Sequence, residues 1–300
     1  MLNYLISLGT IAAIYGIMAL GLNVMWGMTG LVNLGIVGFF AVGGYVSALS
    51  TTVLHWPIGA GMALGAGLSA AIGIVTCYGL RHLRDDYLAI VTLGFAEVVR
   101  IVADNEIWLT HGSDGVSGIP QPLKAYFGSG FDVFYLVLSL TLFAAAYLLA
   151  ELVGTSPFGR VLRAIRDDAG VAAVAGKQVS SFQVRAFGLG SLMAGLAGAL
   201  YGHYTSYIAP EIFVPLLTIY IFLAVTAGGK GNNRGTVLGA FVVIFLIEAS
   251  RFLTGALPLL SPVQVAAGRG IFIGLGFLVI LHVRPQGLLP ERVRRVSPPL

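Results

Sequence analysis

Charged residues are scarce in this chain of 300 residues, where Asp, Glu, Lys and Arg together make up 10% of the sequence. An ordinary soluble domain carries about 25% charged residues. Hydrophobic residues make up 57% of the chain and its mean hydropathy is +0.90. So little polar surface cannot cover a water-soluble fold, and the class of soluble globular proteins is excluded.

Cysteine is nearly absent, because Cys77 is the sole example. A single thiol can form no internal disulfide, and its place inside an apolar run predicts a small core residue.

The histidines are few and scattered, and no His-Glu-x-x-His motif occurs. This pattern disfavours a metal site and a multi-pass membrane enzyme. We expect His55 and His203 to lie at a membrane interface beside Trp56 and Tyr204, as part of an aromatic belt.

A phosphate-binding loop is also missing. That loop needs the pattern G-x-x-x-x-G-K-S/T, whose backbone amides and lysine hold the phosphates. The nearest match, AVTAGGKG at 224–231, lacks the first glycine and the final hydroxyl residue. We therefore expect no cofactor on this chain, and ATP-driven transport would need ATP and Mg²⁺ on a separate ATPase polypeptide.

Long apolar runs recur along the whole chain, and each can cross a hydrocarbon core of about 30 Å as a helix. We predict an all-α integral membrane protein with nine to ten transmembrane helices, the first of them uncleaved. The glycine-rich stretch 21–44 can be read as a broken or re-entrant helix, which would raise the count from nine to ten. The nine candidate spans are 4–25, 31–52, 58–80, 87–103, 132–153, 183–202, 212–228, 236–253 and 266–283.

Lys and Arg collect in alternate connections between these spans. They occur at 81–84, within 154–185, at 230–234 and from 284 to the end of the chain, whereas the segment 104–131 carries mainly Asp and Glu. Basic loops stay in the cytoplasm, so these four segments are predicted to be cytoplasmic. Nine spans then place the N-terminus outside and ten place it inside. The basic residues form no continuous patch, so we expect no nucleic-acid partner.

The cytoplasmic segment 156–179 is polar and regularly spaced. Ser156 and Pro157 suit the cap and first turn of a helix. Apolar and basic residues then recur on different faces, which predicts an amphipathic helix of about four turns. Such a helix can lie in the lipid headgroups or dock into a groove on a soluble partner. The acidic pair Asp167 and Asp168 favours a protein partner over anionic lipid.

The run SPFGRVLRAIRDDAGVAAVAG at 156–176 resembles the coupling loop of permease subunits of ATP-binding-cassette (ABC) importers, in particular the LivM-like branched-chain amino acid permeases. The resemblance covers nearly the whole chain. The supporting segments are YLAIVTLGFAEVVRIV at 87–102, HGSDGVSGIP at 111–120, AGLAGALYG at 194–202, GGKGNNRGTVLGA at 228–240 and RPQGLLP at 284–290.

This resemblance implies one permease domain over 1–290, a cytoplasmic coupling loop at 154–185 and a short basic tail at 291–300. The chain would itself be no enzyme. Its coupling helix would insert into a cleft of a separate ATPase, with Phe158, Leu162 and Ile165 as an apolar wedge and the arginines as a charged rim. The coupling residues are Pro157, Phe158, Gly159, Arg160, Leu162, Arg163, Ala164, Ile165, Arg166, Asp167 and Gly176.

The implied assembly contains a homologous LivH-like permease, two ATPase subunits and a periplasmic solute-binding protein in the bacterial inner membrane, in contact with membrane lipid. The implied cargo is branched-chain amino acids. The residues themselves support only a small polar solute, and wider relatives carry urea, short-chain amides or other amino acids. An ion-coupled secondary transporter is the rival class, but Glu97 and Glu248 each have an arginine three residues on, which disfavours a proton carrier.

Candidates for the translocation path are Asn23, Thr29, Asn33, Glu97 and Arg269. For the glycine-rich stretch the alternative is close helix packing by small residues. For the charges it is self-neutralising pairing, since E-x-x-R at 97–100 and 248–251 places opposite charges one turn apart. The turn 229–235 departs from the family pattern in having Lys230, Asn232, Asn233 and Arg234, and we expect it to be solvated.

Overall fold

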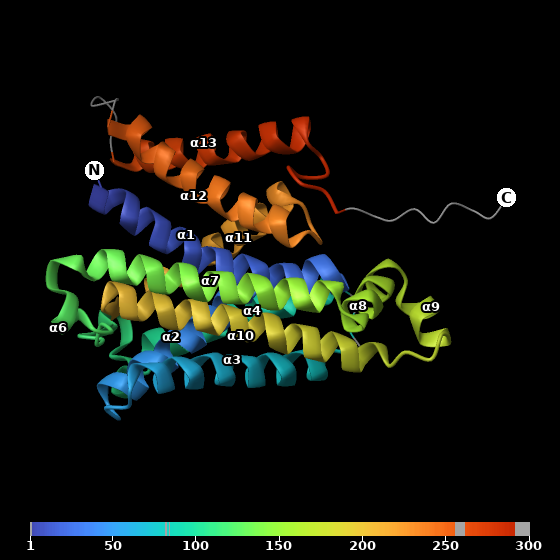
Figure 1. The fold of residues 1–300 in the computed structure, drawn as a ribbon, viewed down its shortest axis with the longest axis horizontal. Helices are drawn as coiled ribbons and strands as arrows, with labels where there is room; N and C mark the ends of the chain where they lie inside the picture. The colour runs from blue at the N-terminus through green and yellow to red at the C-terminus, as the bar shows by residue number, and fades with distance from the viewer. Residues whose placement is uncertain (1, 82, 84, 256–261, 292–300) are drawn as a thin grey trace.

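The computed structural model describes residues 2–81, 83, 85–255 and 262–291. Within these ranges, nine helices of at least 14 residues run along the long axis of the molecule (Figure 1). They coincide with the nine candidate spans. Their bounds are α1 Leu2–Leu22, α2 Ile36–Thr52, α3 Ile58–Leu80, α4 Asp85–Asn105, α7 Phe131–Thr155, α10 Val179–Thr205, α11 Pro215–Gly228, α12 Asn233–Gly255 and α13 Pro262–Val283.

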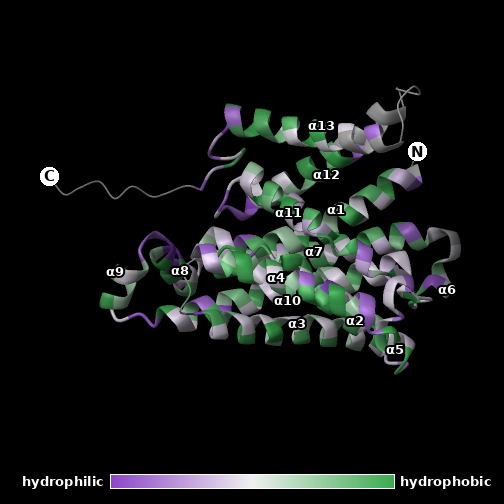
Figure 2. Cartoon of the chain, turned by 180° about the vertical axis from the view of Figure 1, so that it is seen from behind, coloured by the Kyte–Doolittle hydropathy of each residue, from purple (hydrophilic) through white to green (hydrophobic). Residues whose placement is uncertain are grey.

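Length and composition alone mark five segments of the described chain as able to cross a membrane. Two shorter apolar helices, Ile36–Thr52 and Gly270–Val283, accompany them. Hydrophobic residues dominate the long helices along their length, and hydrophilic residues gather at the two ends (Figure 2). The five segments are Asn3–Gly27, Ile58–Leu80, Phe131–Thr155, Val179–Thr205 and Pro210–Gly228.

The glycine-rich stretch breaks the helical path without adding a tenth long helix. After α1 the chain forms one π-helical turn, Asn23–Gly27, and then an irregular segment that leads into α2 at Ile36. The amide of Leu34 donates to Oγ1 of Thr92, 3.1 Å away in the third turn of α4. Irregular backbone at membrane depth requires burial in protein, and α4 supplies that cover here.

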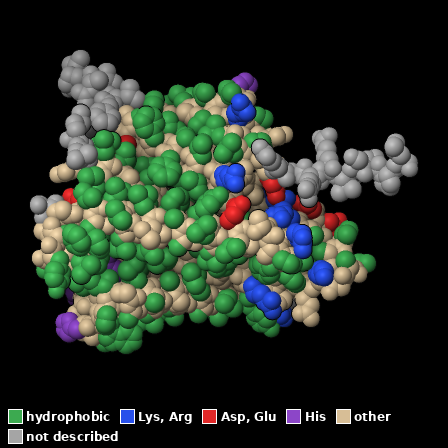
Figure 3. Space-filling view, in the orientation of Figure 1, with side chains coloured by type: hydrophobic (Ala, Val, Ile, Leu, Met, Phe, Trp, Pro, Cys, Tyr) green, Lys and Arg blue, Asp and Glu red, His purple; other side chains and the backbone are tan. Residues whose placement is uncertain are grey.

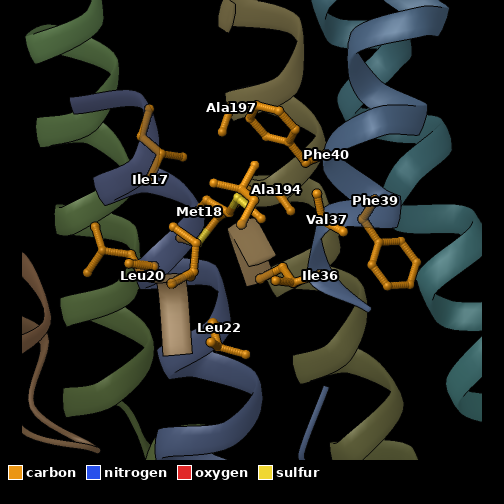
Figure 4. Close-up of a cluster of buried hydrophobic side chains, with 14 of the residues drawn as sticks. Ile17, Met18, Leu20, Leu22, Ile36, Val37, Phe39, Phe40, Ala194 and Ala197 are labelled. Carbon is orange, nitrogen blue, oxygen red and sulfur yellow. The ribbon is translucent and has the colours of Figure 1, made fainter. Parts of the chain in front are cut away.

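Glycines let α2, α3 and α10 pack with their backbones in contact. A Cβ atom at Gly43 would overlap the carbonyl oxygen of Gly195, and one at Gly65 would overlap that of Gly43. Such close approach is how membrane helices gain packing contacts without a hydrophobic driving force. Beside it, Ile17, Met18, Phe40, Ala194 and Ala197 converge from α1, α2 and α10 into a buried apolar cluster (Figure 4).

Short elements fill the connections. At one end of the molecule these are α5 Ile107–Thr110, α6 Lys124–Phe127 and the strands β1 Val116–Ser117 and β2 Tyr207–Ile208, which pair antiparallel. Single 3₁₀ turns also occur at 112–114, 128–130 and 210–212. At the other end lie α8 Pro157–Asp167 and α9 Ala169–Val174.

Two sequence expectations concern single buried residues. Cys77 is buried, as predicted. His203 is buried as well, so its assignment to an aromatic belt is wrong. Its Nε2 atom lies 2.9 Å from Oγ of Ser47 and its Nδ1 atom lies 2.7 Å from the carbonyl oxygen of Pro120. These partners, from α2 and a loop, satisfy both ring nitrogens in the interior.

Lys and Arg side chains gather at the end that carries α8 and α9 (Figure 3), and we call it the basic end. The chain begins at the opposite end, and α13 returns it to the basic end (Figure 1). Because the number of long helices is odd, the first begins at one end of the molecule and the last finishes at the other. The basic end is formed by Arg81, Arg160, Arg163, Arg166, Lys177, Arg185, Lys230, Arg234 and Arg284.

Candidate functional site

The segment 156–174 forms two helices at the basic end instead of one. Ser156 caps α8, because its Oγ accepts a 3.2 Å hydrogen bond from the amide of Gly159, and Pro157 takes the first helical position. The helix stops at Asp167 because Asp168 is extended, with φ −159° and ψ 105°. Oδ1 of Asp168 then accepts from the amide of Val171 at 2.9 Å and starts α9. The predicted single helix of four turns is therefore wrong beyond Asp167.

One face of α8 is buried within this chain. Leu162 is 0% exposed and Ile165 is 3% exposed. Gly159 lets α8 lie directly on the end of α7, since a Cβ there would overlap the carbonyl oxygen of Val153. The ring of Phe158 stacks on Phe182 of α10, with centroids 5.3 Å apart. The interpretation of Leu162 and Ile165 as a wedge for a partner is wrong, because their burial, at roughly 1.5–3 kcal/mol each, holds α8 on its own protein.

The outward face of α8 and the facing side of α9 enclose an open hollow of about 600 Å³, which we call the α8–α9 hollow. Both apolar and charged side chains line it. Gly176, with φ +76°, ends α9 beside it and turns the chain toward α10. The lining residues are Pro157, Arg160, Val161, Ala164, Asp167, Asp168, Val171, Ala172, Ala175 and Lys177.

Arg166 points away from this hollow and fixes α8 to two other segments. Its Nη1 atom donates to the carbonyl oxygen of Gly27 at 2.7 Å and to Oε2 of Glu291 at 2.8 Å. Its Nε donates to Oδ1 of Asp167 at 3.1 Å. Arg163 adds a longer contact, with its Nε 3.9 Å from Oε1 of Glu291. Arg166 therefore joins α8 to Gly27 and Glu291 of the same chain and does not belong to a charged rim around the hollow.

A second network joins the π-helical turn to the connection between α11 and α12. Nδ2 of Asn23 donates to Oδ1 of Asn233 at 2.9 Å, and Oδ1 of Asn23 accepts from the amide of Gly231 at 2.9 Å. Nδ2 of Asn233 donates in turn to Oε2 of Glu151 at 3.0 Å. The expectation of a solvated turn is wrong for Asn233, because its side chain is buried and is hydrogen-bonded to Asn23 and Glu151.

The other two polar candidates in the glycine-rich stretch stabilise its irregular backbone. Oγ1 of Thr29 donates to the carbonyl oxygen of Met25. Oδ1 of Asn33 accepts from the amide of Gly35 at 2.9 Å. Asn23, Thr29 and Asn33 are all buried, and each has a partner within the chain.

Glu97 and Arg100 form an ion pair on α4, with Nη2 of Arg100 2.5 Å from Oε1 of Glu97. The pairing predicted by the E-x-x-R spacing is confirmed here. The Glu97 side chain is nevertheless 37% exposed and that of Arg100 28%, among the exposed apolar side chains of Val98 and Ile101. Glu97 is the thirteenth of 21 residues in α4, so this partly exposed pair lies near the middle of the helix.

The structure describes only some of the other charged side chains that lie within helices. Arg269 lies on α13, but its side chain is outside the described part of the structure, as is that of Arg251. Glu248 accepts a 2.5 Å hydrogen bond from Oη of Tyr4. The structure therefore describes the side chains of Asn23, Thr29, Asn33 and Glu97 but not that of Arg269, and a role in the translocation path stays a prediction for all five.

Residues 4–281 match the family described as the permease component of branched-chain amino acid transport systems. The chain belongs to this family. It is 30% identical to the high-affinity branched-chain amino acid transport permease LivM of Salmonella typhimurium, over 95% of this chain and 70% of that protein. It is 29% identical to the probable LivM of Methanocaldococcus jannaschii, over 96% and 93%. It is 25% identical to LivH of Escherichia coli, over 93% and 92%.

Family membership and the apolar helices make this permease a multi-pass membrane protein. Its sequence resemblance to the LivM-like family is confirmed, and its all-α fold is the fold predicted. Two features of the basic end have no sequence signal that identifies them. Glu291 falls in the predicted tail, although its carboxylate binds Arg166. Gly27 contributes only a backbone oxygen to Arg166, and no side-chain pattern reveals such a contact.

Proposed function

We propose that this permease is one membrane subunit of an ABC importer for branched-chain amino acids in the bacterial inner membrane. It would pair with a homologous permease, bind two ATPase subunits at its basic end and receive solute from a periplasmic binding protein. ATP and Mg²⁺ would be held by the ATPase subunits. The cargo assignment is supported by relatives named for branched-chain amino acid transport, and the pairing by its similarity to both LivM and LivH.

The observation that carries the docking proposal is the α8–α9 hollow. Its lining includes the exposed side chains of Ala164 and Val171 and the charged side chains of Arg160, Asp167 and Lys177. A hollow lined by apolar side chains and by charges of both signs suits a protein surface. It lies at the end where Lys and Arg collect, which the positive-inside rule assigns to the cytoplasm, where ATP is available.

The partly exposed ion pair of Glu97 and Arg100 on α4 supports a second part of the proposal. An ion pair near the middle of a membrane helix is costly against lipid, so the exposed face of α4 needs a protein or aqueous cover. We place the partner permease and the translocation path against this face. Glu97 would then border the path and meet the ammonium group of the amino acid.

Docking is tested by filling the hollow. Ala164→Arg puts a long side chain into the hollow, so the ATPase subunits should be lost when the tagged permease is purified. Ala173→Arg is the matched control, because Ala173 is exposed on α9 but does not line the hollow. Retention of the ATPase by Ala164→Arg would contradict the docking site.

Cargo is tested separately with the whole importer in proteoliposomes. Leucine, isoleucine and valine should each drive ATP-dependent uptake through the binding protein. Uptake of urea or a short amide, with no uptake of the three amino acids, would refute the cargo and leave the docking site intact. Uptake by the permease alone under an ion gradient would refute the ABC mechanism itself.

A further inference from the structure

A second hollow lies at the basic end, between the end of α3 and the start of α10. It has a volume of about 400 Å³, and it shares no lining residue with the α8–α9 hollow. We call it the α3–α10 pocket. It is lined by Tyr78, Arg81, Gln178, Val179, Ser180, Ser181, Val184 and Arg185.

The α3–α10 pocket is positively charged. Arg81 and Arg185 contribute a guanidinium from each helix, and its described lining contains no Asp or Glu. Arg81 is held in place by Tyr78, whose ring centroid lies 4.2 Å from the guanidinium carbon. Arg185 is exposed and forms no ion pair within the described part of the chain. Two arginines facing one hollow suit an anion with several oxygens.

Neutral hydrogen-bond donors complete the lining. Ser180 and Ser181 carry hydroxyl groups and Gln178 carries an amide. These groups and the arginines together match the oxygens of a phosphate ester, because charged donors supply most of the affinity and hydroxyl groups bind the remaining oxygens.

An apolar track leads into the pocket along α3. Leu64, Leu68 and Val75 are exposed on this helix, and their spacing of four and seven residues places them on one face. Tyr78, three residues beyond Val75, extends this face to the pocket, and Arg81 caps the helix there. The face therefore offers hydrocarbon contacts along the helix and positive charge at its end.

We propose that the α3–α10 pocket binds the headgroup phosphate of an anionic phospholipid, with the acyl chains lying along α3. Basic pockets between transmembrane helices on the cytoplasmic side are suited to such headgroups. A free phosphate ion could use the arginines but would gain nothing from the apolar track. This inference depends on the chain spanning a bilayer, and it is independent of the proposed cargo and of ATPase docking.

The test uses the purified importer and native mass spectrometry. The complex is titrated with phosphatidylglycerol, with phosphatidylcholine of the same acyl chains, and with inorganic phosphate. Phosphatidylglycerol should be retained in preference to the other two. Each basic side chain at an anionic lipid surface contributes about fivefold to binding, so Arg81→Gln with Arg185→Gln should weaken retention about 30-fold.

Two further variants keep this test decisive. Arg234→Gln with Arg284→Gln removes the same charge from the basic end outside the pocket, and should change retention less than twofold. Arg81→Lys with Arg185→Lys keeps both positive charges and should therefore retain the lipid. Retention by this variant would show that the loss in the glutamine variant follows from the missing charge.

Three results would overturn the proposal. The first is equal retention of phosphatidylglycerol by the wild type and the folded glutamine variant. The second is displacement of the lipid by inorganic phosphate at the same phosphate concentration, which would indicate a free-anion site. The third is that the glutamine variant loses the ATPase subunits but retains phosphatidylglycerol as the wild type does. That result would assign the pocket to a protein interface.

Discussion

Nη1 of Arg166 lies 2.7 Å from the carbonyl oxygen of Gly27, and this contact joins the helix at the α8–α9 hollow to the end of the π-helical turn that follows α1. π-helical turns are frequent at functional sites. A displacement of α8 by a bound partner would therefore act directly on the break between α1 and α2.

Replacing Arg166 tests this link. Arg166→Gln should leave the ATPase bound, because Arg166 does not line the hollow, but the number of solute molecules carried per ATP should fall about tenfold. A lost charged hydrogen bond of about 1.5–3 kcal/mol is enough for such an effect. The measurement is uptake and ATP hydrolysis in the same proteoliposomes, with Arg234→Gln as control. An unchanged ratio would remove Arg166 from the coupling route.

Substitutions at Glu97 test whether this residue contacts the solute or only pairs with Arg100. Glu97→Gln should lower uptake at least tenfold at unchanged ATPase binding, whereas Asp86→Asn, at the start of the same helix, should have little effect. The double variant Glu97→Gln with Arg100→Gln decides the reason. Recovery of uptake in the double variant would mean that the glutamate serves only to neutralise Arg100, and continued loss would support contact with solute.

Gly65 and Gly67 form a matched pair on α3. Gly65→Ala should destabilise the permease by about 1–3 kcal/mol, because the new methyl group would overlap the backbone of Gly43. At Gly67 nothing lies within 4 Å of an added Cβ. Gly67→Ala should therefore be neutral, or stabilising by up to about 1 kcal/mol through helix propensity. Thermal unfolding of both variants in the same detergent measures the difference, and equal melting temperatures would contradict the packing described.

Asn233 tests the network around the π-helical turn. Asn233→Ala leaves the Nδ2 group of Asn23 and the carboxylate of Glu151 without their partner. Unpaired buried groups cost about 1–3 kcal/mol, and more when charged, so the melting temperature should fall by several degrees. Asn3→Ala removes an exposed amide and serves as control. If both variants melt alike, the network contributes nothing to stability.

The coupling segment shows how far sequence reasoning reaches. Its start at Ser156 and Pro157 was predictable, because capping depends on neighbouring residues alone. Its amphipathic character was also evident from spacing. The sequence could not show whether this chain or a partner would cover the apolar face of the helix. Either arrangement requires the same spacing of apolar residues. The burial of Leu162 and Ile165 is a property of α7 and α10 as much as of α8.

The sequence by itself determined that this is an all-α membrane protein with recurring long apolar segments and one basic end, and it left the number of spans at nine or ten. Those features are local: each helix satisfies its own backbone, and each loop carries its own charges. The tertiary structure alone decided that Asn23 bonds to Asn233 across 210 positions, that Arg166 reaches Gly27, and that His203 is buried. These contacts depend on which helices become neighbours, because the energy of each polar group is set by partners far away in the sequence.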